Sequence, residues 1–359
     1  MLAILQCVNR SLPILQSYAP SFGALLYLQC KMSSESKPSI YITRRIPNEA
    51  MKQLQSSGCS IRQWDSDSPV PRDELLKNIA GVDGLFCLLT DKIDKAVLDQ
   101  AGPGLKVVST MSVGYNHVDI KECQKRNIPV GFTPDVLTDA TAELTIALLL
   151  MTSRRLLEAA EQVKSGGWGS WVPLWMCGPG LSGSTIGILG LGRIGAAIGE
   201  RLLSFRVSKI LYSSRSPKEE TAAKLGAEFV SFDKLLKESD FLIVSCALTN
   251  ETRHIFNAQT FKMMKKSAIL INTSRGDVIK QDDLYSALID GEIAAAGLDV
   301  TTPEPLPTDH PLLTLSNCVV LPHVGSATVE TRTSMAVLAA NNLLAGLNNQ
   351  PLVAQVEVS

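Results

Sequence analysis

The segment TIGILGLGRIG at residues 185–195 constrains the fold more than any other part of the chain. Its first five residues are small, apolar or β-branched, which predicts a buried parallel strand, and Gly190, Gly192 and Gly195 follow with the spacing G-x-G-x-x-G. In that arrangement the first glycine makes a tight turn, the second lets backbone N–H groups approach a pyrophosphate, and the third lets the next helix, expected at 196–205, pack closely on the sheet. The helix N-terminus then faces the phosphates with unpaired N–H groups and its positive dipole end. The segment predicts a dinucleotide site, and a structural glycine turn is the alternative.

The length, charge and cysteine content of the chain narrow its class. A chain of 359 residues is long enough for about two domains. The net charge is −1 and the acidic and basic residues are mixed, which argues against a nucleic-acid or membrane partner. The eight cysteines are scattered and do not cluster with the four histidines, so we expect reduced thiols and no metal site.

The first 32 residues differ in composition from the rest of the chain. They hold no Asp or Glu, only the bases Arg10 and Lys31, and no apolar run that approaches the ~18 residues of a membrane span. An acid-poor segment of this kind can be a mitochondrial presequence, but a single Arg is a poor match. We favour an extension that precedes a working start at Met32, and therefore a cytoplasmic protein.

Strand-like and helical segments alternate along the remaining chain, which predicts α/β architecture with parallel sheets. Between residues 138 and 164 lies the longest helical pattern, and a last helix is expected at 329–347. Four strands are expected before the long helix and six after it, at 39–43, 84–89, 106–110 and 129–132, and then at 185–189, 209–212, 241–245, 268–272, 293–298 and 318–321.

A tryptophan-rich segment, WGSWVPLW at residues 168–175, precedes the glycine strand. Three tryptophans in eight residues are costly to expose to water, so they either pack between domains or meet another subunit. We expect an interface of one of these kinds.

Three residues that follow strands of the second unit could carry chemistry, because ligands of open α/β sheets bind beyond the carboxyl ends of the strands. Arg275 can bind a carboxylate through a bidentate fork, which a lysine cannot do. His323 can donate a proton near neutral pH, and Glu304 can hold the imidazole in one tautomer and favour its charged form. Together they suffice for the reduction of a 2-oxo acid beside a nicotinamide. Taken singly, each could be an ordinary surface or loop residue.

Further candidates lie near these three. Asp299 lies in the apolar context AAAGLDV, where it either contacts the nicotinamide amide or makes structural hydrogen bonds to backbone. The small residues Ser112, Val113 and Gly114 follow a strand of the first unit and suit backbone donors that face a ligand. The other histidines, His117, His254 and His310, are interpreted as structural or surface residues.

The segment after the second strand of the glycine unit indicates the type of cofactor. An NAD-preferring fold places Asp or Glu there to bind the ribose 2′-hydroxyl, and this chain has none. Instead it has Ser214, Arg215 and Ser216, with Lys218 nearby, which suit a 2′-phosphate. We therefore expect NADP(H) to be preferred over NAD(H).

With these residues assembled, the chain resembles the D-2-hydroxyacid dehydrogenase family, and within it the reductases of glyoxylate and hydroxypyruvate. The resemblance extends over residues 38–351 and is carried by several long segments, among them ITRRIP, STMSVGYNHVD, GFTPDVLTDATAEL, GGWGSWVPLWMCG, INTSRGDV, AAAGLDVTTPEPLP and LPHVGSAT. It implies two Rossmann-like domains, a flavodoxin-like substrate domain and a doubly wound dinucleotide-binding domain, with a cleft between them. It also implies that the last helix returns to the substrate domain and that the protein is a homodimer.

The resemblance implies limits for these domains and roles for further residues. The expected parts are an N-terminal extension at 1–34, for which disorder is one alternative, a substrate-binding domain at 35–136 and 329–359, and an NADP(H)-binding domain at 137–328. Arg275, Glu304 and His323 correspond to the catalytic residues of the family. Substrate contacts are expected from Val113, Gly114, Arg275, Ser326 and, across the subunit interface, Trp171; cofactor contacts are expected from Gly190, Gly192, Arg193, Ile194, Gly195, Ser214, Arg215, Ser216, Thr273, Asp299 and Gly325.

The expected activity is the NADPH-dependent reduction of glyoxylate to glycolate and of hydroxypyruvate to D-glycerate. Another enzyme of the same family, of phosphoglycerate or D-lactate dehydrogenase type, is one alternative. A nucleotide-sensing binding protein related to the corepressors that share this fold is another.

Overall fold

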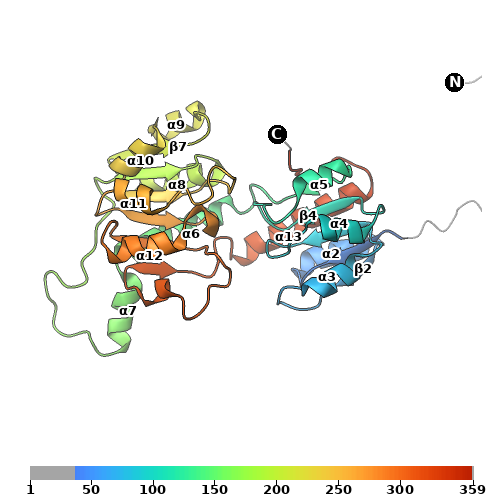
Figure 1. Cartoon of the computed structure of the whole chain (residues 1–359), viewed down its shortest axis with the longest axis horizontal. Coiled ribbons are helices and arrows are strands. Elements are labelled where there is room, and N and C mark those ends of the chain that lie inside the picture. Colours follow the sequence, from blue (N-terminus) through green and yellow to red (C-terminus); the bar gives the residue numbers. More distant parts are fainter. Residues whose placement is uncertain (1–36, 358–359) are drawn as a thin grey trace, which may run out of the picture. The chain divides into compact units, whose positions relative to one another are not determined.

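The computed structural model describes residues 37–357, so the expectations for the N-terminal 32 to 34 residues lie outside the described part. Strands and helices alternate through the described chain and form two parallel sheets (Figure 1). This confirms the predicted α/β class.

The first sheet has the strand order β2-β1-β3-β4-β5 in the described residues, and every pairing in it is parallel. This is the flavodoxin-like order. Its strands are β1 (Ser39–Ile42), β2 (Ser60–Gln63), β3 (Gly84–Cys87), β4 (Val107–Thr110) and β5 (Val130–Gly131). The helices of this part are α2 (Asn48–Ser56), α3 (Arg72–Ile79), α4 (Lys95–Ala101), α5 (Ile120–Lys125) and, from the far end of the chain, α13 (Val329–Leu347).

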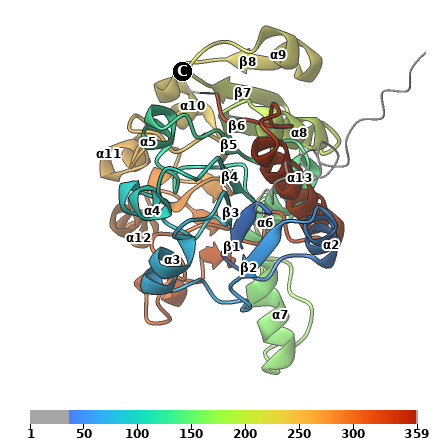
Figure 2. The same cartoon turned by 90° about the vertical axis from the view of Figure 1, so that its right-hand side faces the viewer.

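Helices cover both faces of the first sheet. The helices α2 and α13 lie on one face around a core that includes Ile40, Phe86 and Leu343, and α3 and α4 lie on the other around Leu85 and Val108 (Figure 2). The last helix therefore returns to the first sheet, as expected. The residue limits of the two domains stay a prediction.

The second sheet has the order β12-β11-β10-β9-β6-β7-β8 in the described residues, again with parallel pairing throughout. The order reverses between β6 and β9, as in doubly wound dinucleotide-binding sheets. The strands are β6 (Thr185–Leu189), β7 (Lys209–Ser213), β8 (Ala227–Phe229), β9 (Phe241–Val244), β10 (Ile269–Asn272), β11 (Ala295–Leu298) and β12 (Cys318–Val320).

Two hydrophobic cores lie on the two faces of the second sheet. One contains side chains of α6 (Thr138–Ser153), α8 (Arg193–Leu203) and α9 (Glu219–Leu225). The other contains side chains of α10 (Phe232–Glu238), α11 (Ala258–Met263) and α12 (Gln281–Ile289). The short 3₁₀ helices η1 (Gly276–Val278) and η2 (Pro311–Thr314) follow β10 and precede β12.

Two strands were missed by the sequence analysis, β2 in the first sheet and β8 in the second. Both lie at sheet edges, and their residues are partly or fully exposed. An edge strand needs no continuous apolar run, so SIRQ and AEF lack the pattern that marks the buried strands. The second sheet therefore has seven strands in the described residues instead of the expected six.

The long helix expected at 138–164 is two helices. The first, α6, ends at Ser153, and α7 (Leu156–Lys164) begins after Arg155, whose φ of 53° is left-handed and cannot continue a right-handed helix. No residue of α7 is buried, whereas α6 packs on the second sheet. In Figure 1 α7 and the segment after it project from this part of the chain.

Two properties of the described residues bear on partners and ligands. No helix within residues 37–357 combines the length and the apolar character that crossing a bilayer requires. In the same residues no cluster of three or more His, Cys, Asp or Glu side chains is arranged to hold a metal ion, and the six described cysteines are free thiols.

Candidate active site

A cavity of about 200 Å³ lies where the carboxyl ends of strands from both sheets meet. The second sheet contributes Arg275 after β10, Glu304 after β11 and His323 after β12. Leu89, Asn116 and His117, which follow β3 and β4, line it from the first sheet. The three predicted catalytic residues therefore lie together.

Glu304 and His323 form a directly bonded pair. The Nδ1 atom of His323 lies 2.8 Å from Oε2 of Glu304, and Oε1 of the same carboxylate accepts the backbone N–H of Thr301 at 3.1 Å. Burial raises the pKa of Glu304, but the hydrogen bond and charge of His323, the Thr301 N–H and Arg275 outweigh it, so that the pKa lies below its usual value. An ionised Glu304 accepts from Nδ1–H and leaves Nε2 of His323 available for proton transfer.

Arg275 is half-buried and is held at two of its three nitrogens. Its Nε donates to Oδ1 of Asn116 at 3.1 Å, and Nη1 donates to the carbonyl of Ser274 at 2.6 Å. Burial lowers the pKa of Arg275 and the charge of Glu304 opposes that effect. The guanidinium also occupies the space that a side chain at Gly114 would need. The outer edge of the guanidinium, Nη2 and the second proton of Nη1, keeps donors for a carboxylate.

Asp299 anchors the loop that carries His323. It is 1% exposed, and its two oxygens accept the backbone N–H groups of Val324 and Gly325, each at 2.8 Å. Its own carbonyl accepts the N–H of His323, which has a left-handed φ of 55°. Burial raises the pKa of Asp299 although these two N–H groups and His323 lower it. The structure thus shows the backbone hydrogen bonds that were one of the two expected roles.

The glycine segment has the geometry of a dinucleotide loop. Gly190 has φ of 96°, and a Cβ there would come within 2.8 Å of the backbone of Cys246 after β9. At Gly195 a Cβ would overlap the carbonyl of Gly190, so the first turn of α8 packs directly on the turn. Nothing lies within 4 Å of a Cβ at Gly192, so the space beside that residue is free for a ligand. These residues fit a pyrophosphate, and α8 begins at Arg193, before the expected residue 196.

Comparisons with known proteins agree with this geometry. The sequence model described as D-isomer specific 2-hydroxyacid dehydrogenase, NAD binding domain, matches residues 146–325. A human protein named glyoxylate reductase/hydroxypyruvate reductase is 58% identical over 320 residues, which are 89% of this chain and 98% of that protein.

The chain belongs to the D-isomer specific 2-hydroxyacid dehydrogenase family.

Solved structures show the same relationship for this 2-hydroxyacid dehydrogenase. A structure from Thermus thermophilus matches with a TM-score of 0.83 and 41% identity, over 89% of this chain and all of that one. An NADPH-dependent glyoxylate/hydroxypyruvate reductase from Sinorhizobium meliloti, solved with NADP and malonate, matches with a TM-score of 0.78 and 33% identity, over 89% of this chain and 97% of that one. A nicotinamide dinucleotide is therefore the cofactor type of this dehydrogenase.

The other predicted cofactor residues lie around the second sheet. Gly325 is buried, and its backbone N–H donates to Asp299. The hydroxyl oxygens of Thr273 and Thr145 lie at hydrogen-bond distance, 2.8 Å. Ile194 is half-buried in α8. Arg193 pairs with Asp135 at 2.5 Å. After β7, Ser214 donates to the carbonyl of Ser216 at 2.7 Å, and Arg215 is exposed.

The predicted substrate residues divide into two groups. Val113 and Gly114 are half-buried in the loop against Arg275, and Ser326 is half-buried three residues after His323. Trp171 does not line the cavity of its own chain and is 83% exposed. Trp168 and Trp175 are also exposed, so the tryptophans do not pack between the sheets, and contact with a second subunit is the alternative that stays a prediction.

Besides the chain neighbours of Arg275 and Glu304, four cavity residues were not singled out from sequence as site residues. Leu89, Asn116 and Leu248 line the cavity, and His117, interpreted as structural or surface, lines it beside Arg275. All four follow strands β3, β4 or β9. Applying the strand-end rule after β3, after β9 and, beyond Gly114, after β4 could have found them.

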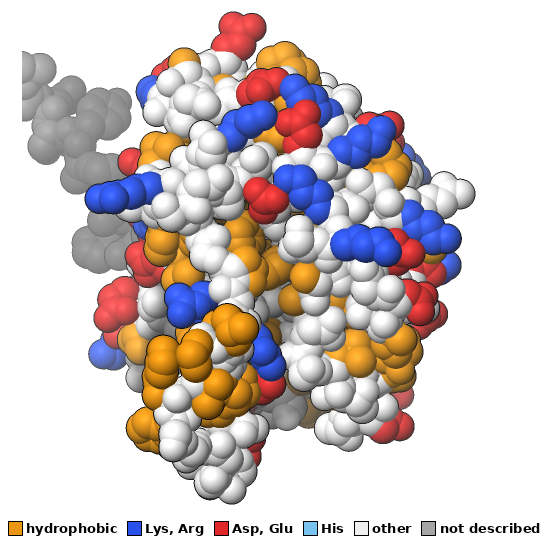
Figure 3. Space-filling view, turned by 90° about the vertical axis from the view of Figure 1, so that its left-hand side faces the viewer, with side chains coloured by type: hydrophobic (Ala, Val, Ile, Leu, Met, Phe, Trp, Pro, Cys, Tyr) orange, Lys and Arg blue, Asp and Glu red, His pale blue; other side chains and the backbone are white. Residues whose placement is uncertain are grey.

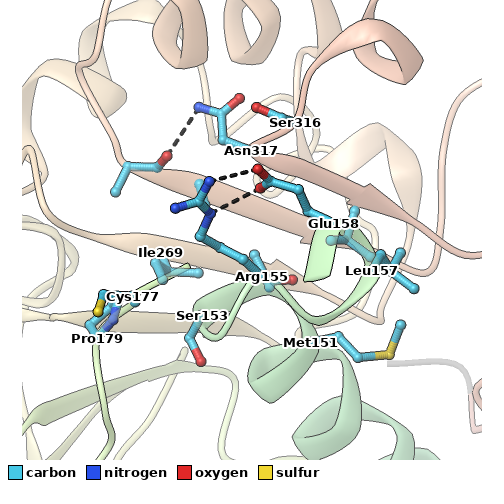
Figure 4. Close-up of a pocket in the computed structure, with 15 residues that line it drawn as sticks. Met151, Ser153, Arg155, Leu157, Glu158, Cys177, Pro179, Ile269, Ser316 and Asn317 are labelled. Carbon is cyan, nitrogen blue, oxygen red and sulfur yellow. Dashed lines mark hydrogen bonds and ion pairs between the residues drawn. The ribbon is translucent and has the colours of Figure 1, made fainter. Parts of the chain in front are cut away.

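A second cavity, of about 300 Å³, lies away from these residues. Ile269, Ala295 and Asn317 place it at the amino ends of β10, β11 and β12, opposite the catalytic edge. Figure 4 shows Ile269 and Asn317 among the residues that line it. Arg155 and Glu158, which line this cavity, form a bidentate ion pair through two hydrogen bonds. It contains none of the predicted site residues.

Proposed function

We propose that this 2-hydroxyacid dehydrogenase reduces glyoxylate to glycolate and hydroxypyruvate to D-glycerate, with NADPH as the preferred reductant. The observation that carries the proposal is the convergence of Arg275, Glu304 and His323 on one small cavity. The names of the human and Sinorhizobium meliloti relatives support the choice of substrates.

Arg275 binds the carboxylate of the 2-oxo acid through the outer edge of its guanidinium. Its Nε already donates to Asn116, so the pair of donors Nε and Nη2 cannot bind a carboxylate together. The carboxylate instead binds to the pair Nη1 and Nη2. Backbone N–H groups of the loop at Val113 and Gly114 face the same carboxylate. This places the keto group toward His323.

His323 supplies the proton. When bound, a reduced nicotinamide supplies the hydride that adds to C2. The carbonyl oxygen then gains negative charge, and His323 transfers the Nε2 proton to it while Glu304 stabilises the charged imidazole that precedes transfer. One hydride and one proton convert the ketone to a hydroxyl group, and the carboxylate is unchanged.

The preference for NADPH rests on the segment after β7. Strand β7 ends at Ser213, and the next residues are Ser214, Arg215 and Ser216, with no carboxylate at the position that binds a ribose 2′-hydroxyl. The exposed Arg215 guanidinium suits a 2′-phosphate.

The segment from α7 to Trp175 supports a homodimer. Leu157, Val163, Trp171 and Leu174 are all at least 49% exposed on it. The space-filling view in Figure 3 shows hydrophobic side chains gathered on a projecting part of this face. A contiguous exposed patch of this kind marks a protein interface. Trp171 of each subunit then approaches the active site of the other subunit. We also propose that the enzyme is cytoplasmic.

The decisive experiment follows NADPH oxidation with glyoxylate and with hydroxypyruvate, beside NADH and beside 3-phosphohydroxypyruvate and pyruvate. We expect turnover of the first two acids with a higher kcat/KM for NADPH. Turnover of only the phosphorylated acid or pyruvate contradicts the substrate assignment, and a preference for NADH contradicts the cofactor assignment.

A further inference from the structure

A chain of hydrogen bonds runs from His117 to the loop that faces Arg275. Nε2 of His117 lies 2.9 Å from Oγ1 of Thr110, the last residue of β4, and that oxygen lies 2.8 Å from Oγ of Ser112. The Ser112 hydroxyl donates to the carbonyl of Gly114 at 2.8 Å. Thr110 and Ser112 are buried, so these bonds have little competition from solvent.

The carbonyl of Gly114, at the end of this series of hydrogen bonds, determines which atom donates in each of them. A carbonyl can only accept, so the single proton of Ser112 is committed to Gly114. Ser112 must then accept from Thr110, whose single proton is used in turn, and Thr110 must accept from His117. The Nε2 atom of His117 therefore carries a proton.

The charge of His117 follows from its surroundings. Burial, reinforced by the neighbouring charge of Arg275, lowers the pKa of His117 to about 4. Near neutral pH the imidazole is therefore the uncharged Nε2–H tautomer with a bare Nδ1. An uncharged ring beside Arg275 leaves the guanidinium as the cation that meets the substrate.

The loop at the end of this chain contacts Arg275 at two points. The backbone of Gly114 lies against the guanidinium so closely that a side chain there has no space, and Asn116, next to His117, accepts the Nε proton. The position of the loop thus sets the distance between its backbone donors and Arg275.

We propose that His117 is a positioning residue for substrate binding, which acts through Thr110 and Ser112 to fix the backbone turn at Val113 and Gly114. This role rests on the proposed function, because that turn is assigned to the substrate carboxylate. In this role His117 acts on the backbone turn and not on the reacting atoms.

The kinetic test compares His117→Leu with His117→Gln. Leucine removes the donor, whereas the Gln side-chain amide can donate from about the position of the imidazole Nε2. We expect Leu to raise KM for glyoxylate about tenfold, equivalent to about 1.4 kcal/mol, with KM for NADPH unchanged and kcat within about threefold, as for loss of a ground-state contact. Gln should restore KM to within about threefold of wild type. The matched control is the exposed His254→Leu, which should match wild type.

Two kinetic results overturn the proposal: a His117→Leu enzyme with wild-type KM, or equal defects in the Leu and Gln variants. A general loss of folding would instead lower kcat and raise KM for NADPH as well, and Gln would not rescue it.

The second test needs no substrate. NMR spectra of ¹⁵N-histidine-labelled wild type and His117→Gln identify the imidazole signals of His117 as those that the variant lacks. These signals should be those of a neutral Nε2–H tautomer from about pH 7 to about pH 5. An Nδ1–H tautomer, or protonation near pH 6, overturns the inference. Wild-type protein that shows the expected tautomer but reduces neither 2-oxo acid contradicts the proposed function instead.

Discussion

Replacing Arg275 by Lys tests the proposed mode of substrate binding while the positive charge is kept. Arg275 uses Nε for Asn116 and one proton of Nη1 for Ser274, and it presents Nη2 and the other Nη1 proton to the carboxylate. The single ammonium of Lys cannot hold both anchors and also make a two-point contact.

The size of the effect follows from the bonds that are lost. A hydrogen bond to a charged group contributes about 1.5–3 kcal/mol, and Lys loses one of the two in the fork. The half-buried carbonyl of Ser274 also loses its donor, at a further cost of about 1 kcal/mol. The sum is about 3 kcal/mol, so kcat/KM for glyoxylate should fall on the order of 100-fold.

The assay is initial-rate NADPH oxidation at saturating NADPH, with KM for NADPH measured separately and expected to be unchanged. Arg45→Lys is the matched control, because Arg45 forms exposed ion pairs with Asp65 and Asp67, one of which Lys can retain. It should lie within about twofold of wild type, as expected for a surface pair worth under about 1 kcal/mol.

A complementary variant, Arg275→Ala, opens a space beside Gly114 that soluble guanidinium can enter. Partial rescue of kcat/KM by guanidinium, and less by ammonium, is the expected result. An Arg275→Lys enzyme within about threefold of wild type refutes the two-point binding mode.

Three further predictions concern other parts of the molecule. Glu304→Gln should lower kcat/KM at least about tenfold. The pKa of Glu304 in the folded protein lies below its usual value, so the ionised carboxylate stabilises the fold at pH above the unfolded pKa of about 4.3. This stabilisation is lost only as the pH falls through the lower pKa of the folded state. The Tm difference between wild type and Glu304→Gln should thus be constant from about pH 7 to 5 and narrow below about 4 in thermal melts; a difference that closes near pH 6 contradicts the pairing with His323. Arg215→Asp should shift the ratio of kcat/KM for NADPH over NADH at least about tenfold toward NADH; an unchanged ratio sinks the 2′-phosphate assignment. Leu174→Glu should produce monomers in light scattering, whereas Glu at the similarly exposed Val353 should not; equal masses for both variants remove this face from the interface.

The sequence predicted the strands that are buried on both faces and missed one exposed edge strand in each sheet. The strands β3 and β9 are buried at every position and are continuous apolar runs; β10 is equally buried and is apolar up to its last residue, Asn272. The edge strands β2 and β8 each pair with a single neighbouring strand. Their conformation therefore depends on that neighbour, and their own residues show no apolar pattern that predicts a strand.

The candidate site was predictable to the extent that it follows from strand ends. Arg275, Glu304 and His323 could be named because carboxyl ends of parallel strands share one edge. The partners of Asp299 and the role of His117 could not, because they depend on distances between segments far apart in sequence or on the path of a loop. Single-residue motifs do not encode these distances.

The break at Arg155 links the failure in helix prediction to the proposed dimer. A helix that continued through residue 155 would keep the same axis, but the left-handed turn redirects the chain, and Arg155 then stabilises α7 by pairing with both oxygens of Glu158 at 2.9 and 2.6 Å. The redirected segment exposes Leu157, Trp171 and Leu174. At about 1.5–3 kcal/mol for each such side chain, their burial in a second subunit contributes several kcal/mol toward association. The same turn that ends α6 therefore creates the surface that a partner would cover, and loss of the dimer in Leu174→Glu should lower substrate turnover as well if Trp171 completes the neighbouring active site.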